Sequence, residues 1–286
     1  MAAKALRQRG VAVVTAMLVT ALAVTLVTGV FWQQQQLVRG MEGQRLRLQG
    51  RLIVRSALDA ACLALREADA QGGVAAPDGA WQAPLAEALD GTLTQRIEDA
   101  QSRFNLRNLA PGGRINLFQV SAFERLLSAL RLDPALAYRA AEAMSGGARM
   151  LEPQRLEDLA SQREFTPAAL ERLRDFVVLL PEPTAVNVNT ASAEVLTSVA
   201  NFSLQDARRL VELRRQAWFK DGADFAMRLN DKETLEGVDY QVSSSYFLVR
   251  SRLRLERAQL DTQALVQRRG GGTAKTTTAL LWLRDD

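Results

Sequence analysis

Residues 4–38 read KALRQRGVAVVTAMLVTALAVTLVTGVFWQQQQLV, and this stretch decides the class of the protein. Three basic residues precede Gly10, and no charged residue follows before residue 39. About twenty apolar residues, at a rise of 1.5 Å each, span about 30 Å, the hydrocarbon thickness of a bilayer. The run is too long for a cleaved secretory signal, and no Ala-x-Ala cleavage site follows it. We predict a single membrane-spanning helix, with the basic N-terminus in the cytoplasm and the remaining chain across the inner membrane.

The apolar run passes without a break into an amphipathic helix. Apolar residues recur at helical spacing from Leu37 to about Leu65. Gly40, Gly43 and Gly50 weaken this helix locally. Its apolar stripe must be buried, either by the stalks of partner subunits or by the chain's own sheet. The stripe comprises Leu46, Leu52, Ile53, Ala57 and Leu58.

The composition argues against an enzyme. The sequence contains no histidine, which removes the commonest general base and the commonest zinc ligand. Cys62 is the only cysteine, so no intramolecular disulfide can form, and we interpret it as a small apolar residue packed among Leu58, Leu63 and Leu65. The formal net charge is +4, from 36 basic and 32 acidic residues, and this near balance argues against nucleic-acid binding. We predict no catalytic residue.

The middle of the chain predicts a little β structure and then a helical block. A Gly/Ala/Pro-rich link at residues 71–79 precedes Trp81, and alternation at residues 93–106 predicts two short strands. Capping and stop signals for helices follow. These signals are a capping-box spacing between Ser121 and Glu124, at the start or just inside a helix that runs to Arg131, Asp133 with Pro134, a stop at Gly146 and Gly147, and Thr166 with Pro167 ahead of a helix that ends before Pro181.

Residues 187–219, NVNTASAEVLTSVANFSLQDARRLVELRRQAWF, resemble a helix-hairpin-helix unit. We predict that Thr190 caps the first helix and Ser203 the second, with the turn at Asn201, Phe202 and Ser203. DNA-binding hairpins of this kind use glycines so that backbone N–H groups approach phosphate closely. This turn has no glycine, so we predict a packing role. Weak DNA binding at low salt could come only from Arg208, Arg209, Arg214 and Arg215.

Alternation returns near the C-terminus and predicts antiparallel strands. In residues 246–256, one face carries Phe247, Val249, Leu253 and Leu255, and the other carries Arg250, Arg252 and Arg254. We interpret the arginine stripe as a solvated face of the sheet. Residues 258–266 continue the pattern, and glycines at 270–272 make a turn. The last strand covers residues 276–283, with Trp282 on the face opposite to Leu281 and Leu283.

A glycine between a basic leader and an apolar run, followed by an amphipathic stalk, resembles the N-terminus of type IV pilins and pseudopilins. The resemblance implies that a prepilin peptidase cuts between Gly10 and Val11. Most pilins carry glutamate at the fifth mature position, which here is Thr15, and that glutamate pairs with the free amine of a neighbouring subunit. Its absence is typical of the K-type minor pseudopilins of type II secretion systems, the general secretion pathway protein K family.

Four further stretches are similar to recurrent phrases of the K-type family: residues 103–106, 113–117, 187–192 and 244–247. The resemblance, which spans almost the whole chain, implies an α+β fold. It consists of a long N-terminal membrane and stalk helix, a pilin-like α/β body with an antiparallel sheet, and a large inserted all-helical domain. The predicted boundaries are a leader at 1–10, the helix at 11–66, the first part of the body at 74–114, the inserted domain at 115–236 and C-terminal strands at 237–286.

The same resemblance implies a structural subunit at or near the tip of a short periplasmic pseudopilus, which supports export of folded proteins across the outer membrane of a bacterium. The expected partners are the I-, J- and H-type minor pseudopilins, the major pseudopilin, the prepilin peptidase and the secreted substrates. The alternative is a membrane-anchored helix-hairpin-helix protein that binds DNA during uptake. The missing hairpin glycines argue against that alternative.

The resemblance also raises the question of calcium, because many family members hold it at an acidic cluster in the helical insert. Here the corresponding acids, in residues 145–165, are spread as on a helix surface, not as alternating oxygen ligands in a loop. We therefore predict no metal site and no cofactor. Asp221 and Asp224 are interpreted as solvated or capping residues. The spread acids are Glu152, Glu157, Asp158 and Glu164.

Overall fold

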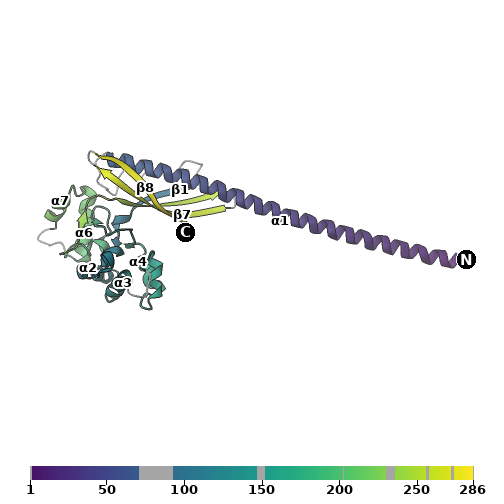
Figure 1. The fold of residues 1–286 in the computed structure, drawn as a ribbon, viewed down its shortest axis with the longest axis horizontal. Coiled ribbons are helices and arrows are strands. Elements are labelled where there is room, and N and C mark those ends of the chain that lie inside the picture. The colour runs from purple at the N-terminus through teal and green to yellow at the C-terminus, as the bar shows by residue number, and fades with distance from the viewer. Residues whose placement is uncertain are drawn as a thin grey trace.

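The computed structural model describes residues 2–70, 93–146, 152–201, 203–229, 236–255, 258–271 and 274–285. The link at 71–79, Trp81, Gly147, Phe202 and Gly272 lie outside these ranges. Figure 1 shows a long helix, a sheet that lies along its C-terminal part, and a group of short helices on the other side of the sheet.

Helix α1 (Ala2–Ala70) confirms the prediction of a long N-terminal helix. Its 69 residues extend about 100 Å at 1.5 Å each. Its N-terminal part projects away from the head, the part of the molecule formed by the sheet and the short helices (Figure 1). The predicted weak point at Gly50 does not interrupt the helix. A Cβ atom there would come within 3.2 Å of Leu260 Cδ1 and 3.3 Å of Leu253 Cδ2, so this glycine lets the helix approach the sheet closely.

The sheet is antiparallel, and α1 covers one of its faces. Strands β1 (Leu93–Asp99), β6 (Tyr246–Leu255), β7 (Ala258–Gly271) and β8 (Ala274–Asp285) lie in that order. Buried residues recur every three or four positions on the helix, namely Val54, Leu58, Ala61 and Leu65. Their partners on the sheet are Leu93, Ile97, Phe247, Val249, Leu253, Ala264 and Val266.

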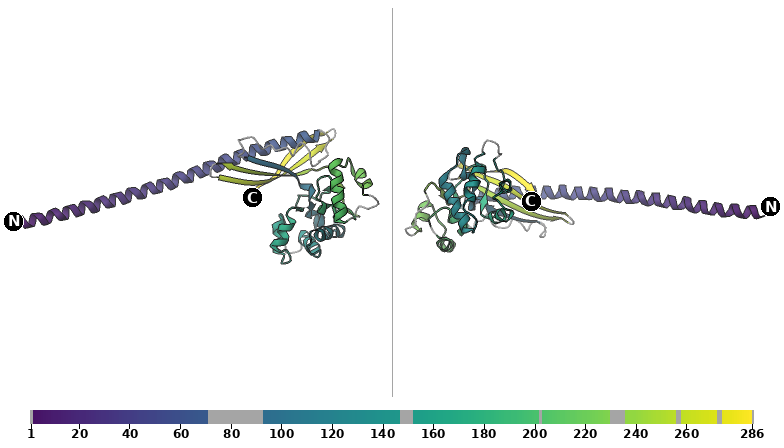
Figure 2. Two further views of the ribbon diagram at one scale, coloured as in Figure 1. Left: turned by 180° about the vertical axis from the view of Figure 1, so that it is seen from behind. Right: turned by 90° about the horizontal axis from the view of Figure 1, so that it is seen from below.

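The helical part is inserted between two neighbouring strands. β1 pairs with β6 from Leu93 opposite Leu253 to Asp99 opposite Phe247. Residues 100–245 therefore stand where a simple hairpin would have its turn. Figure 2 shows from two further directions that this part lies at the end of the head far from the N-terminus. The architecture confirms the predicted α+β class.

The inserted part packs short elements around one apolar core. Phe104 and Phe123 stack in this core with their ring centroids 5.1 Å apart. The core thus includes residues ahead of position 115, where the inserted domain was predicted to begin. It also contains two pairs of short parallel strands, so it is not all-helical. The elements are η2 (Ala100–Ser102), β2 (Phe104–Asn105), η3 (Leu106–Leu109), η4 (Pro111–Gly113), α2 (Leu117–Ala129), α3 (Leu136–Met144), η5 (Leu156–Ser161), α4 (Pro167–Leu173), β3 (Val177–Val178), β4 (Val186–Asn187), α5 (Ala193–Leu196), α6 (Leu204–Gln216), α7 (Gly222–Met227) and β5 (Tyr240–Gln241).

The observed N-termini of the helices agree only in part with those predicted from the sequence. Thr166 caps α4 as predicted, because its hydroxyl accepts a hydrogen bond from the Ala169 N–H at 3.2 Å. The capping-box spacing at Ser121 lies inside a helix, the second of the two predicted alternatives, since α2 begins at Leu117 with Asn116 as its N-cap. Asp133 accepts from the N–H of Ala135, two residues on, and α3 begins only at Leu136.

The faces of the C-terminal strands follow the alternation, with one correction at the arginine stripe. Arg252 and Arg254 are exposed, but Arg250 is half-buried where the helical part approaches the sheet. The stripe is therefore not a uniformly solvated face. On β8, Trp282 packs against Leu265 on the side of the helical part, as the alternation predicts.

Candidate assembly site on the stalk helix and its joint with the head

The N-terminal part of α1 suits a membrane. Val14–Gln35 has a mean hydropathy of 2.2, and none of it is buried within the chain. The hydroxyls of Thr20, Thr25 and Thr28 each donate to a backbone carbonyl three or four residues earlier, at 2.6–2.8 Å. These bonds satisfy the hydroxyls within the helix, which is required in hydrocarbon. The length and polarity of this segment therefore fit a membrane-spanning helix.

The sequence-predicted processing residues lie on the same helix. Gly10 and Val11 are helical, and Thr15 is exposed at the start of the apolar segment. A carboxylate at position 15 would have to be paired in hydrocarbon, because an unpaired charge there costs on the order of several kcal/mol. This helix offers a threonine at that position, so it presents no such charge. Cleavage between Gly10 and Val11 stays a prediction.

A second apolar stripe runs along the outer side of the stalk. Met41, Leu48, Leu52 and Leu63 are 63%, 63%, 69% and 51% exposed. At about 100° per residue they share one face of α1, centred about 140° around the helix from the face that Val54, Leu58, Ala61 and Leu65 present to the sheet. They form the outer stripe, an apolar surface that the described part of the subunit does not cover.

The predicted apolar stripe of the stalk is thereby divided between two faces. Ile53, Ala57 and Leu58 pack against the sheet as predicted. Leu52 does not belong to that packed group, because it points outward with the outer stripe, and its burial by a partner stalk stays a prediction. Leu46 is half-exposed. The sequence could not separate the two faces, since apolar residues occur on both.

A buried carboxylate joins the sheet to the helical part. Asp99, at the end of β1, is 4% exposed. It accepts hydrogen bonds from the Gln101 N–H at 2.8 Å, Asn187 Nδ2 at 2.8 Å, Ser244 Oγ at 2.6 Å and the Thr190 hydroxyl. Burial raises the pKa of Asp99, and these hydrogen bonds oppose the rise. Segments from both ends of the insertion therefore meet at one carboxylate.

Two further polar side chains extend this joint. Asn189 makes two hydrogen bonds with the backbone of Phe219. Its Nδ2 donates to the Phe219 carbonyl at 2.9 Å, and its Oδ1 accepts from the Phe219 N–H at 2.8 Å. Arg268 on β7 donates to the Ser244 carbonyl at 2.9 Å and to the Leu65 carbonyl of α1 at 3.3 Å. The stalk, the sheet and the inserted part are thus connected by one polar network.

The sequence missed this joint, although it singled out part of it. Thr190 was predicted to cap a helix, and this is wrong: Ser192 is the N-cap of α5, and Thr190 bonds to Asp99. The available signal was the group of polar residues Asn187, Asn189 and Thr190 within a short strand and its turn. Such a group requires buried partners, but their positions depend on the fold.

Hydrogen bonds within the protein hold the turn of the helix-hairpin-helix-like segment in place. Ser203 caps α6 as predicted, in a reciprocal arrangement with Asp206. Arg125 of α2 donates to Asn201 Oδ1 at 3.1 Å and to the Thr197 carbonyl at 3.0 Å. The described part of this turn is therefore packed against α2, which favours the predicted packing role.

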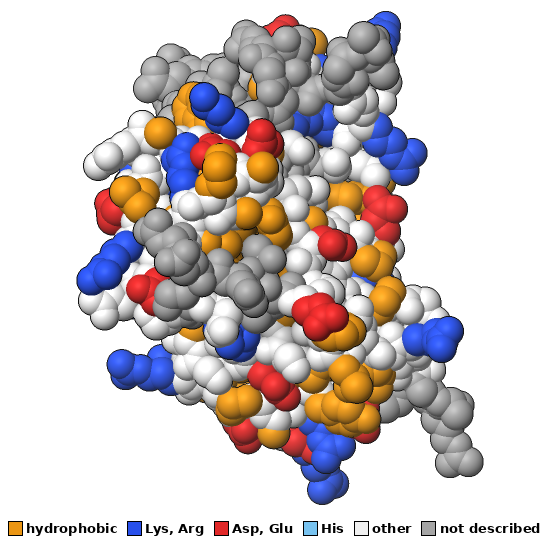
Figure 3. Space-filling model, turned by 90° about the vertical axis from the view of Figure 1, so that its left-hand side faces the viewer, with side chains coloured by type: hydrophobic (Ala, Val, Ile, Leu, Met, Phe, Trp, Pro, Cys, Tyr) orange, Lys and Arg blue, Asp and Glu red, His pale blue; other side chains and the backbone are white. Residues whose placement is uncertain are grey.

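The arginines of α6 do not form one basic surface. Arg214 is 8% exposed and donates to the Val188 carbonyl at 2.7 Å, and burial lowers its pKa to about 10. Arg215 pairs with Glu212 at 2.8 Å. Among the four arginines proposed for weak DNA contact, Arg214 is thus directed into the protein. On the face drawn in Figure 3, basic and acidic side chains alternate without a continuous basic area.

The acidic residues are engaged in structural roles. Glu152 pairs with Arg107, and Asp158 Oδ2 accepts from the N–H groups of Gln154 and Arg155 at 2.8 and 2.9 Å. Within the described ranges, no group of three His, Cys, Asp or Glu residues is placed to hold a metal ion. Asp221 caps α7 by accepting from the Asp224 N–H at 2.8 Å, which agrees with its interpretation as a capping residue.

Comparison with known proteins gives three matches. A family model described as type II secretion system (T2SS), protein K matches residues 186–249, which include Asn187 and Ser244 of the joint. The type II secretion system protein K of Pseudomonas aeruginosa is 30% identical over 307 residues, covering 92% of this chain and 90% of that protein. A chain in the crystal structure of the GspK-GspI-GspJ complex from the enterotoxigenic Escherichia coli type 2 secretion system is 20% identical, with a TM-score of 0.68, and the match covers 86% of this chain and 99% of that one.

A bare apolar helix at the N-terminus, continued by a stalk that packs on an antiparallel sheet, defines a membrane-anchored, pilin-like subunit. The match to the P. aeruginosa protein extends over nearly the full length of both chains. The chain belongs to the type II secretion system protein K family. It is accordingly a minor pseudopilin, a component of protein transport, and the DNA-uptake alternative is not favoured.

Proposed function

We propose that this subunit is a structural cap at or near the tip of a periplasmic pseudopilus. Its apolar helix anchors it by a single pass in the bacterial inner membrane, and its head lies in the periplasm. It acts by assembly and not by catalysis, and in this way supports export of folded proteins across the outer membrane. The absence of histidine from the sequence supports a role without acid–base chemistry.

The observation that carries the proposal is the outer stripe. Met41, Leu48, Leu52 and Leu63 are exposed on the side of the stalk away from the sheet, in continuity with the apolar helix. Fully burying each leucine side chain would contribute about 1.5–3 kcal/mol. A stalk of a partner subunit provides such burial, because parallel helices pack through apolar stripes.

Two features support a place at the tip. Thr15 replaces the glutamate that would neutralise a neighbour's amine within hydrocarbon, so stacking of identical copies receives no such help. The inserted part also enlarges the head at the end far from the N-terminus (Figure 2). A subunit with this shape can occupy the top of a filament but obstructs a further subunit above it.

The proposed partners are the I-, J- and H-type minor pseudopilins and the major pseudopilin. The similarity in fold to a chain of the GspK-GspI-GspJ complex supports the first two of these. Prepilin peptidase would act earlier, between Gly10 and Val11, and secreted substrates would meet the assembled head.

Substitution of the outer stripe tests the proposal. Leu48→Gln combined with Leu52→Gln should reduce co-purification with full-length I- and J-type partners by about tenfold or more, because apolar burial is lost. Both side chains are exposed, so the circular dichroism of the subunit should not change. The control is Arg47→Gln, an exposed residue on another side of the helix. Unchanged co-purification of the double variant would contradict assembly through the stalk.

A further inference from the structure

A basic cleft lies between the sheet and the inserted part, away from the stalk. Its volume is about 540 Å³. Residues of β6, β7 and β8 line one side, and residues around η5 and α4 line the other. Five of the lining residues are arginines, whereas Glu157 is the only carboxylate among them. The arginines are Arg103, Arg155, Arg174, Arg250 and Arg284.

At one end of the cleft, two arginines share a single carboxylate. Arg103 Nη2 lies 2.8 Å from Glu98 Oε2, and Arg250 Nε lies 3.6 Å from the same oxygen. The Nε atom of Arg250 is buried and has no hydrogen-bond partner among the described residues. A buried donor without a hydrogen-bond partner is costly. The Arg250 side chain as a whole is 39% exposed, so the rest of its guanidinium is accessible to an acceptor that enters the cleft.

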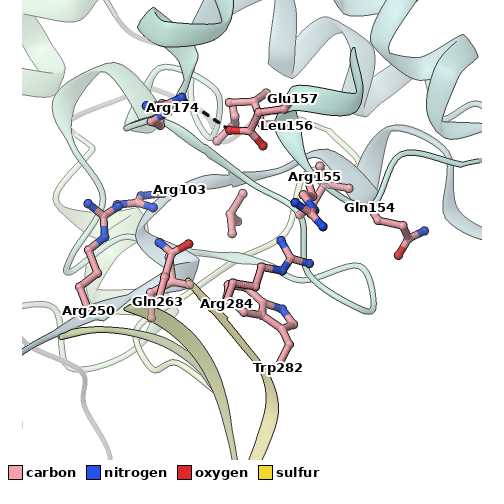
Figure 4. A pocket seen from close by; sticks show the side chains of 14 residues that line it. Arg103, Gln154, Arg155, Leu156, Glu157, Arg174, Arg250, Gln263, Trp282 and Arg284 are labelled. Atoms are coloured by element: carbon pink, nitrogen blue, oxygen red, sulfur yellow. Dashed lines mark ion pairs between the residues drawn. The ribbon is translucent and has the colours of Figure 1, made fainter. Parts of the chain in front are cut away.

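At the other end, Arg155 and Arg284 lie close together, as Figure 4 shows. Burial and repulsion from Arg155 lower the pKa of Arg284. The carboxylates of Glu157 and Asp158 oppose this lowering of the Arg284 pKa. The Arg284 guanidinium stands 4.2 Å from the centre of the Trp282 ring, which also lines the cleft. This pair holds two positive charges beside an apolar surface.

The remaining arginine is already neutralised. Arg174 lies 3.2 Å from Glu171 and 3.6 Å from Glu157. The two ends of the cleft are thus the basic positions, and Figure 4 shows Gln263 between them and Trp282 beside Arg284. A single small anion at one end cannot also engage the other. An extended chain with carboxylates at intervals can reach both and place an apolar side chain on Trp282.

We propose that this cleft binds an extended acidic segment of a partner protein. One carboxylate is held by the guanidinium forks of Arg155 and Arg284, and a second accepts from Arg250 beside Arg103. Arginine suits this task, because its planar fork matches a carboxylate with two parallel hydrogen bonds. Since the lining comes from both the sheet and the inserted part, the bound segment also fixes these two parts together. The site is separate from the outer stripe and does not depend on the assembly proposed above.

The test uses the full chain in uncharged detergent. A fluorescein-labelled peptide of alternating glutamate and leucine is titrated with the protein, and its fluorescence anisotropy is measured. The expected result is saturable binding of the peptide. The double substitution Arg155→Gln with Arg284→Gln should weaken this binding about tenfold or more, because charge-assisted hydrogen bonds are lost. Arg155→Glu alone, at an exposed position, should weaken it as well. The control Arg254→Gln, an exposed arginine of β6 outside the cleft, should change it less than about twofold.

Three outcomes would overturn the proposal. The first is no binding of the peptide to the unaltered chain. The second is equal affinity for the double variant, which would place the peptide elsewhere. The third is equal binding of a matched peptide with glutamine in place of glutamate, or binding of inorganic phosphate without binding of the peptide, since either would remove the carboxylate segment as the ligand.

Discussion

Ser244 Oγ donates a hydrogen bond of 2.6 Å to Asp99 Oδ2, across 145 residues of sequence. Asp99 ends β1, and Ser244 lies two residues before β6, the strand that pairs with it. The bond therefore closes the base of the inserted part. Because Asn187 and Thr190 from inside the insertion bind the same carboxylate, its loss would loosen three connections at once.

Asp99→Ala should lower the free energy of unfolding by about 2–4 kcal/mol, because buried donors lose their acceptor. Denaturant titration of the full chain in detergent measures the change. Glu212→Ala, which removes only an exposed ion pair with Arg215, should cost less than about 1 kcal/mol. Equal effects of the two substitutions would show that the joint contributes no special stability.

Cys62 should react slowly while α1 is packed on the sheet. Its thiol is half-buried beside β8, and burial raises its pKa. The thiolate is the reactive form, so a raised pKa lowers its population at a given pH near neutrality. We expect the rate with a thiol reagent at pH of about 8 to be at least about tenfold lower than in the unfolded chain. The rate should keep rising with pH beyond the point where the unfolded chain levels off. Equal rates in the two states would contradict the packing of the stalk on the sheet.

Gly10→Glu should block processing in cells that contain the prepilin peptidase. The glycine stands where the basic leader meets the apolar run, and a charged side chain there would change the site that the peptidase reads. Mass spectrometry should find Val11 as the first residue of the unaltered protein and the intact leader in the variant. An unprocessed natural chain in such cells would end the pseudopilin interpretation of this N-terminus.

The regular elements were predictable because their signals are local. The uncharged run after Gly10 predicts the membrane helix, and the alternation around Phe247 predicts a strand that faces α1 on one side. The caps at Thr166 and Ser203 also follow from residue type and spacing.

The polar joint around Asp99 and the division of the stalk's apolar residues between two faces were not predictable, because both depend on contacts between distant parts of the chain. Three of the partners of Asp99 lie 88 to 145 residues away, so no local pattern marks it as buried. Leu52 and Leu58 both fit a helical apolar pattern, and only the position of the sheet decides that one is exposed and the other buried. Arg214 likewise reads as a surface residue, although the Val188 carbonyl holds it inside.

Light scattering of the full chain with full-length I- and J-type pseudopilins tests the central claim most directly. The account predicts one complex with the mass of one copy of each subunit, because the outer stripe is covered by partner stalks and no glutamate at Thr15 assists stacking of identical copies. Long filaments formed by this chain alone, or the absence of any complex with the two partners, would contradict it.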